Sequence, residues 1–192
     1  MFKIFNKLKQ KKQIKDSIDD FMNLWETDFD DIWSIDIKSN LLVALNGWIC
    51  KKSNYGENFE ILSQAEKVFY LVFQLEGEVD NGGFSQFFYN SSGDFSNETP
   101  AALREIGANK TAAICDKALF PFGGALPQNR DEREAVLDNL LTDEINEILN
   151  QCDSAFYEEP DDLSELNYPV CRKTPCFSYG DIRHFHRIYA SN

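Results

Sequence analysis

The stretch that decides the fold is Asp80-Asn81-Gly82-Gly83-Phe84-Ser85-Gln86-Phe87-Phe88-Tyr89-Asn90-Ser91-Ser92-Gly93-Asp94. Its Asn-Gly-Gly portion tolerates positive φ, so it predicts a sharp corner after a helix. Three phenylalanines then recur at i, i+3 and i+4, which is the spacing of one buried helical face. Asn, Gly and Asp residues close the stretch with turn chemistry. We therefore expect a core helix between two tight turns, with Phe84, Phe87 and Phe88 inward.

The polar residues of this stretch have two interpretations. In the first they cap and turn a helix of the scaffold, which is the usual role of polar residues beside an aromatic stripe. In the second they converge on a small pocket, as binding residues do. The set consists of Asp80, Asn81, Gln86, Asn90 and Asp94. The aromatic spacing favours the scaffold interpretation.

The stretch resembles the signature Asp-Asn-Gly-Gly-Phe-x-Gln-Phe-Phe-x-Asn-x-x-Gly of a bacterial domain family of unknown function that includes a DNA mimic protein. The approach from Glu66-Lys67-Val68-Phe69-Tyr70 through Glu76-Gly77-Glu78-Val79 and the segment 100–108 also resemble that family, and we extend the resemblance over about residues 40–170. It implies an acidic domain that occupies the DNA-binding surface of a regulator or of another basic protein.

Helical signals surround the stretch on both sides. Ser63 and Glu66 form a capping box that predicts a helix ending near Gly77. Thr99-Pro100 predicts another helix, which Gly107 closes. Further helices are expected over 16–25, 41–50, 110–120, 132–140 and 143–152, the last capped by Thr142; loops are expected at 28–31 and 121–127, and a short acidic turn at 161–166.

These patterns predict an all-α protein with a single compact domain of many short helices. The charge divides the chain into three parts. Residues 1–15 carry six Lys and no acid, residues 16–170 carry 31 acids against nine basic residues, and residues 171–192 carry a net charge of +3. We therefore expect an acidic domain over 16–170 between a basic N-terminal helix and a basic C-terminal extension. Oligomeric state stays open, with a homodimer as one option.

The negative central segment excludes a class of function. Its carboxylates repel the phosphates of DNA or RNA, and they attract basic protein surfaces. Direct nucleic-acid binding is therefore not expected. The basic amphipathic segment 1–15 could contact a membrane surface or pack on the acidic body, and we favour packing because the counter-charge belongs to the same chain.

Chemical motifs are sparse. We find no zinc-protease helix, phosphate loop, dinucleotide fingerprint or nucleophile elbow, so no cofactor is expected. Cys171, Cys176, His184 and His186 depart from zinc-ligand spacing, so no metal site is expected. No apolar run could span a bilayer, no secretory signal is recognisable, and the five Cys form no regular framework, so we expect a cytoplasmic protein with reduced thiols.

The acids near the C-terminal end are the best binding candidates. From 130 to 165, thirteen acids stand against two Arg. Carboxylates three or four residues apart on a helix lie about 5–6 Å from one another, a spacing comparable to that of phosphates along a nucleic-acid strand. The candidates are Asp131, Glu132, Glu134, Asp138, Asp143, Glu144, Glu147, Glu158, Glu159, Asp161, Asp162 and Glu165. A surface that only maintains solubility is the alternative, and the spacing of the acids taken by itself favours that alternative.

Three functions fit the sequence. The first is a protein-binding module, in the form of a DNA mimic, whose partner is a DNA-binding regulator or another basic protein. The second is an enzyme or small-ligand domain with its pocket at Asp80, Asn81, Gln86, Asn90 and Asp94. The third is an inhibitor of a basic toxin. The first is preferred because the family resemblance implies it and the charge agrees with it, whereas only the clustering of its polar residues supports the second.

Overall fold

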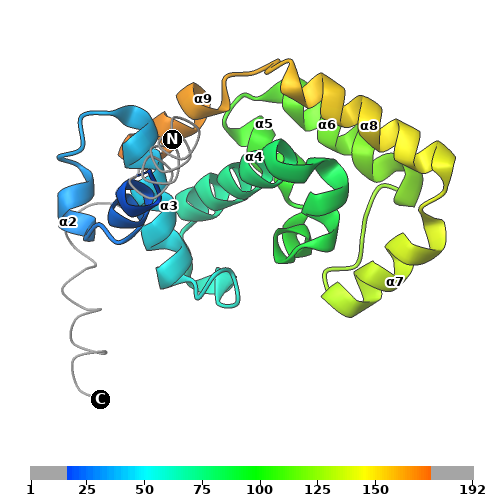
Figure 1. The fold of residues 1–192 in the computed structure, drawn as a ribbon, viewed down its shortest axis with the longest axis horizontal. Helices are drawn as coiled ribbons and strands as arrows, with labels where there is room; N and C mark the ends of the chain where they lie inside the picture. Colours follow the sequence, from blue (N-terminus) through cyan, green and yellow to red (C-terminus); the bar gives the residue numbers. More distant parts are fainter. Residues whose placement is uncertain (1–16, 174–192) are drawn as a thin grey trace, which may run out of the picture. The chain divides into compact units, whose positions relative to one another are not determined.

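The computed structural model describes residues 17–173, and every regular element in that range is an α-helix or a 3-10 turn (Figure 1). The all-α prediction is confirmed. Contacts divide the chain into two compact units, one up to residue 58 and one from residue 59 onward. The basic segment 1–15 and most of the extension 171–192 lie outside the described residues.

The first unit contains a helix over 17–25, then α2 (Phe29–Ile32) and α3 (Lys38–Lys52). The expected helices over 16–25 and 41–50 are present within the described range. Close approach explains Gly47 in α3, because a Cβ there would lie 2.6 Å from the carbonyl oxygen of Trp25. The ring of Trp48 on α3 packs against Phe29 on α2 with centroids 4.5 Å apart.

The loop expected at 28–31 is wrong, because α2 occupies most of it. Asp28 holds the N-cap position, and Asp30 and Asp31 lie in the first turn, where carboxylates interact favourably with the helix dipole. Ile32 ends the helix fully buried and anchors it by its side chain. Charge density alone suggested a loop, whereas the position of each acid relative to Ile32 favours a helical turn.

The second unit is organised around α4 (Gln64–Tyr89). The predicted capping box is confirmed: Ser63 Oγ accepts a hydrogen bond from the Glu66 amide at 3.4 Å, and Glu66 Oε2 accepts one from the Ser63 amide at 2.8 Å. The predicted end near Gly77 is wrong, since α4 continues through it. A glycine in a helix interior costs about 1 kcal/mol relative to alanine, and the buried Leu75 and Val79 on either side offset that cost.

The remaining elements cover α4 from several directions. They are η1 (Phe59–Ile61), η2 (Ser91–Phe95), α5 (Thr99–Glu105), α6 (Asn109–Leu119), η3 (Phe120–Phe122), α7 (Arg130–Leu140), α8 (Asp143–Tyr157) and α9 (Leu163–Lys173). α4 contacts η2, α5, α7, α8 and α9, and Figure 1 shows α6 and α8 side by side. The elements that pack around α4 therefore come from most of the second unit.

Several predicted boundaries hold and two do not. Gly107 ends the α5 region with φ of 90°, and Thr142 Oγ1 accepts a hydrogen bond from the Ile145 amide, as expected. α8 extends five residues beyond Cys152, because Phe156 is buried in the core. The short turn expected at 161–166 is the start of the longer helix α9, whose first turn Asp162 caps by accepting from the Glu165 amide at 2.8 Å.

The signature phenylalanines form the aromatic centre of the second unit, as predicted. Phe84, Phe87 and Phe88 are at most 2% exposed. Phe84 meets Phe156 of α8 edge to face at 6.0 Å, and Phe88 meets Phe122 of η3 at 5.8 Å. Such aromatic contacts add to the stabilisation that area burial supplies. The signature helix therefore joins α8 and η3 into one core.

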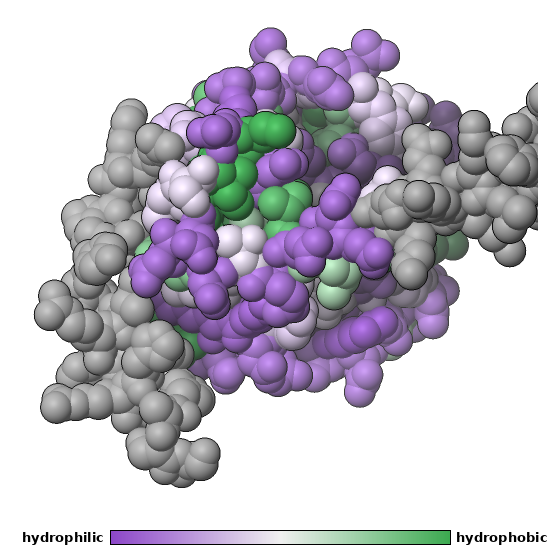
Figure 2. Space-filling model, turned by 60° about the vertical axis from the view of Figure 1, so that its left-hand side comes forward, coloured by the Kyte–Doolittle hydropathy of each residue, from purple (hydrophilic) through white to green (hydrophobic). Residues whose placement is uncertain are grey.

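The outer surface contrasts with this core. The face drawn in Figure 2 is mostly hydrophilic, with a smaller group of hydrophobic side chains near its middle. None of the helices within 17–173 combines the length and apolar composition that crossing a bilayer requires.

Candidate functional site

The signature sequence begins with a kink in α4. Gly82 and Gly83 leave helical geometry, and Gly83 has φ of 74°, which glycine adopts without a steric penalty. The amide of Phe84 then donates to Asp153 Oδ1 of α8 at 2.7 Å. Asp153 therefore satisfies the first free amide of the resumed helix from another element. A Cβ on Gly83 would lie 2.4 Å from the same carboxylate.

Glu78 accepts hydrogen bonds from three polar residues of the signature. Its Oε2 accepts from Gln86 Nε2 and Asn90 Nδ2, both at 2.7 Å, and its Oε1 accepts from Ser92 Oγ at 2.9 Å. Asn81 Nδ2 donates to Gln86 Oε1 at 3.1 Å and closes the network. Charge-assisted hydrogen bonds of this kind are stronger than neutral ones. The network ties the chain before the kink to the turn η2 after it.

Arg133 of α7 fixes the other end of the signature. Its side chain is fully buried. It donates to Asp94 Oδ1 at 2.6 Å and to the carbonyls of Phe88 at 2.7 Å and Asn90 at 3.0 Å. It also donates to two carbonyls of the loop before α7, those of Pro127 and Gln128. A buried charge is tolerated because its partners are this complete.

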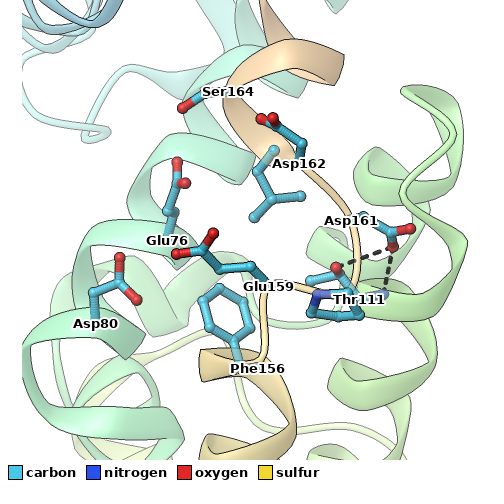
Figure 3. Close-up of a pocket in the computed structure, with 10 residues that line it drawn as sticks. Glu76, Asp80, Thr111, Phe156, Glu159, Asp161, Asp162 and Ser164 are labelled. Carbon is cyan, nitrogen blue, oxygen red and sulfur yellow. Dashed lines mark hydrogen bonds between the residues drawn. The ribbon is translucent and has the colours of Figure 1, made fainter.

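A cavity of about 180 Å³ lies between α4, the start of α6 and the segment that joins α8 to α9 (Figure 3). Figure 3 shows the Glu159 carboxylate directed toward Glu76 and Asp80. On the opposite wall, Asp161 Oδ2 accepts from the Thr111 amide at 2.8 Å and from its hydroxyl at 3.1 Å. The ten residues that line the cavity are Glu76, Asp80, Thr111, Phe156, Glu159, Pro160, Asp161, Asp162, Leu163 and Ser164.

The electrostatics of this cavity are those of crowded carboxylates. Burial, followed by the negative charges of Asp80, Asp162 and Glu159, raises the pKa of Glu76 from 4.5 to about 7. Burial and then the charge of Glu159 raise the pKa of Asp80. The ten lining residues include no basic side chain; from outside that set, Lys110 Nζ donates to the Pro160 carbonyl at 3.2 Å. The cavity therefore favours protons or cationic groups over anions.

Further exposed acids lie on α7 and α8. α8 contains no Lys or Arg, and α7 contains only Arg130 and the buried Arg133. The exposed acids of these helices and of the residue after α8 are Asp131, Glu132, Asp138, Asp143, Glu144, Glu147 and Glu158. We call this set the acidic face. With Arg133 buried, its negative charge has little compensation from the two helices themselves.

Some of the predicted acids have partners within the chain. Glu134 pairs with Arg130 at 2.8 Å, and Asp138 accepts from the Tyr89 hydroxyl at 2.8 Å. Burial and this contact with Asp138 raise the pKa of Tyr89 to about 12. Gln151 donates to Glu147 at 3.4 Å along α8. Of these partners only Arg130 is a basic side chain.

Comparison with known proteins gives a family match that covers most of the second unit. A family model described as DMP19-like protein matches residues 60–174, which is more than half of the chain. The chain belongs to the DMP19-like protein family. Searches of the curated proteins and of the solved structures found no match.

The DMP19-like match begins at residue 60, about twenty residues after the start expected from the sequence. That start nearly coincides with the boundary between the two compact units at residues 58 and 59. The kink, the Glu78 network, the cavity and the acidic face all lie inside the match. These features therefore belong to the DMP19-like part of the chain.

The structure separates the five residues proposed for a pocket. Gln86, Asn90 and, through Gln86, Asn81 belong to the Glu78 network. Asp94 pairs with Arg133. Asp80 is the member that lines the cavity, where it lies with Glu76 and Glu159 rather than with the other four.

Of the acids proposed for partner binding, three also line this cavity: Glu159, Asp161 and Asp162. Glu165, in the first turn of α9, is exposed.

Sequence reasoning missed four residues of the DMP19-like part. Glu76 and Glu78 lie in the middle of α4. Because they are two residues apart on the helix, their side chains lie on different faces and have different neighbours. Asp153 and Arg133 act on residues 69 and 39–45 positions away along the chain. One signal was available: Arg133 lies one turn before the buried Leu137, on the apolar side of an otherwise polar helix.

Proposed function

We propose that this DMP19-like protein is a DNA mimic that binds a basic, DNA-binding protein through its acidic face. Family membership supports a role of this kind, and the charge of the acidic face supports our choice of that face as the contact. The observation that carries the proposal is that α8 presents exposed acids with no basic residue among them, beside an α7 whose arginines are buried or paired.

The spacing of the acids fits a phosphate-like array. Asp143, Glu144 and Glu147 lie within about one helical turn of one another on α8. Such neighbours on a helix are about 5–6 Å apart. A DNA-binding surface presents Lys and Arg to phosphates, so it also attracts carboxylates held at this spacing on a rigid element. Association should be fast at low salt and slower when salt is added.

The test begins with capture of proteins from the source cell on the full-length chain, at low and at moderate salt. A captured DNA-binding protein is then bound to a labelled duplex, and displacement of the duplex by the chain is followed by fluorescence anisotropy. We expect competitive displacement that weakens with salt. Capture of no DNA-binding protein at either salt concentration, or a captured protein that keeps its duplex, contradicts the proposal.

Two variants of equal net charge place the contact. Glu144→Lys, Glu147→Lys and Glu158→Lys together reverse three exposed acids of the acidic face. Glu60→Lys, Glu98→Lys and Glu105→Lys together reverse three exposed acids elsewhere in the second unit. The first variant should lose displacement and the second should retain most of it. Equal loss in both would show that total charge, not this face, governs binding.

A basic toxin is the alternative partner, and the same variants test it. Its surface chemistry resembles that of a DNA-binding protein, so the acidic face would serve both. Capture of a basic protein that binds no DNA and whose toxicity the chain suppresses would assign the inhibitor function. A small-ligand function centred on Asn81, Gln86 and Asn90 is less favoured, because their side chains are engaged with one another or with Glu78.

A further inference from the structure

Phe120 is the most exposed large hydrophobic side chain among residues 17–170, with 78% of its surface accessible. It belongs to η3, directly after α6. The other phenylalanine of this turn, Phe122, is buried against Phe88. The turn thus holds one aromatic ring in the core and leaves the other in solvent, where its apolar surface is available to a partner.

The backbone holds Phe120 in place. Its carbonyl accepts from the Gly123 amide at 3.1 Å, and the Leu119 carbonyl accepts from the Gly124 amide at the same distance. Both glycines have positive φ, 81° and 86°, which favours glycine at these positions. Pro121 further restricts the turn. The exposed ring is therefore carried on a fixed turn, so little conformational entropy is lost when a partner contacts it.

Side-chain contacts across α6 and α8 place Phe120 beside the acidic face. Lys117 Nζ lies 3.5 Å from Gln151 Oε1, and Gln151 donates to Glu147 at 3.4 Å. Phe120 follows Lys117 by three residues, and Glu147 precedes Gln151 by four. Because α6 and α8 run antiparallel, both steps lead one helical turn toward the same end (Figure 1).

We propose that Phe120 is the aromatic anchor of the acidic face and receives an arginine side chain of the basic partner. The guanidinium lies over the ring while Glu144 and Glu147 supply the counter-charge at its edge. A planar, weakly hydrated guanidinium stacks on an aromatic ring better than a lysine ammonium does, and carboxylates beside the ring disfavour a purely apolar partner. Aromatic anchors with a polar rim are the usual centres of binding energy in interfaces. This inference rests on the proposed function and adds the chemistry of the contact.

The test uses the full chain with two probes, hexa-arginine and hexalysine peptides, at low salt. Titration calorimetry gives the affinities, and NMR follows the side-chain methylene protons of the peptides. We expect wild-type protein to prefer hexa-arginine and to shift its methylene protons upfield by the ring current of Phe120. Phe120→Leu, which keeps apolar volume but removes the ring, should weaken hexa-arginine binding roughly two- to fivefold and abolish that shift. Phe120→Trp should retain both.

Controls separate this inference from the function on which it rests. Ile61→Ala truncates another exposed apolar residue and should leave both peptides unaffected. If Phe120→Leu leaves the hexa-arginine affinity and the methylene shift unchanged, or weakens both peptides equally, the anchor is refuted. The triple reversal at Glu144, Glu147 and Glu158 tests the acidic face itself. Peptide binding that is insensitive to this reversal refutes the face, whereas binding sensitive to the reversal and not to Phe120→Leu refutes only the anchor.

Discussion

Glu76 and Glu78 are two residues apart on α4 and have opposite surroundings. Glu78 accepts hydrogen bonds from Gln86, Asn90 and Ser92. Glu76 faces the carboxylates of Asp80, Glu159 and Asp162 across the cavity. One carboxylate therefore joins segments of the fold, and the other repels its neighbours. The same residue type stabilises or destabilises this helix according to what the rest of the chain brings to it.

The comparison extends to the whole second unit. The polar residues of the signature other than Asp80 include Gln86, Asn90 and Asp94, whose side chains pair with Glu78 or Arg133, and Asp153 binds the backbone at the kink. The acids of the cavity and of the acidic face have few basic partners within the described part of the chain. Satisfied polar groups contribute to folding, whereas concentrated like charge does not. Stability therefore explains most of the signature, but it does not explain the concentration of acids in the cavity and on the acidic face.

The largest loss of stability should come from replacing Arg133, the buried cation that donates five hydrogen bonds. Arg133→Ala removes five donated hydrogen bonds and leaves the carboxylate of Asp94 without its cation. We expect the free energy of unfolding to fall by about 3–5 kcal/mol, as measured by urea denaturation. Arg130→Ala, on the exposed side of the same helix, should change it by less than about 0.5 kcal/mol. A loss below about 1 kcal/mol for Arg133→Ala would contradict the view that the paired polar groups stabilise the fold.

A comparable test of the core is Phe87→Ala. Phe87 is 2% exposed and lies 5.6 Å from the ring of Phe88. Its truncation should cost about 3–5 kcal/mol, because it removes a buried ring and leaves a cavity. Tyr157→Ala is not a suitable control since the Tyr157 hydroxyl donates to the Val79 carbonyl, so an exposed Ile61→Ala variant serves instead. Equal stability losses for these two variants would contradict the packing described for the signature.

How far the sequence could predict these features depends on the range of the interaction. The capping box at Ser63 and the phenylalanine spacing are local, and both predictions were confirmed. Gly77 was misjudged because a local helix-stop signal is overridden by burial on both sides of it. The roles of Asp153 and Arg133 depend on partners far along the chain, and no local pattern encodes them. For the same reason, Glu76 could not be distinguished from Glu78.

Replacing Glu78, which accepts hydrogen bonds from three side chains, should have an intermediate effect on stability. Glu78→Ala leaves the amides of Gln86 and Asn90 and the Ser92 hydroxyl without their acceptor. We expect a loss of about 2–3 kcal/mol, with Glu78→Gln losing less because one acceptor oxygen remains. Thermal unfolding of the three proteins at one pH checks this order. A Glu78→Ala variant as stable as wild type would show that the network adds nothing to the fold.

Replacing Glu76, whose neighbours in the cavity are carboxylates, should raise the stability of the protein rather than lower it. The pKa of Glu76 rises from 4.5 to about 7 in the folded protein, so folding favours its protonated form. Its contribution to stability is complete below about pH 4.5 and is lost as the pH rises through 7. Glu76→Gln mimics the protonated form. It should leave stability nearly unchanged at pH 4.5 and increase it by about 1–2 kcal/mol at pH 8, a value reduced for partial exposure.

Chemical denaturation of wild-type and Glu76→Gln proteins across pH 4.5–8 measures this difference. Asp80→Asn is the matched control, because burial and Glu159 raise the pKa of Asp80 as well but its side chain is more exposed. We expect a smaller gain at pH 8 for this control. If Glu76→Gln were less stable than wild type at pH 8, the cavity would hold a satisfied carboxylate and the contrast with Glu78 would disappear.

The smallest effect on stability should come from the acidic face. Glu144, Glu147 and Glu158 are exposed, and Glu147 makes a long side-chain hydrogen bond with Gln151. Replacing each by Lys should change the free energy of unfolding by within about 0.5 kcal/mol, with Glu144 the most costly because it lies in the first turn of α8, where the helix dipole favours a carboxylate. Circular dichroism during urea denaturation measures this. Stable variants that no longer bind a basic partner would show that these acids serve recognition, whereas variants that unfold would place the acidic face with the Glu78 network among the groups that hold the protein together.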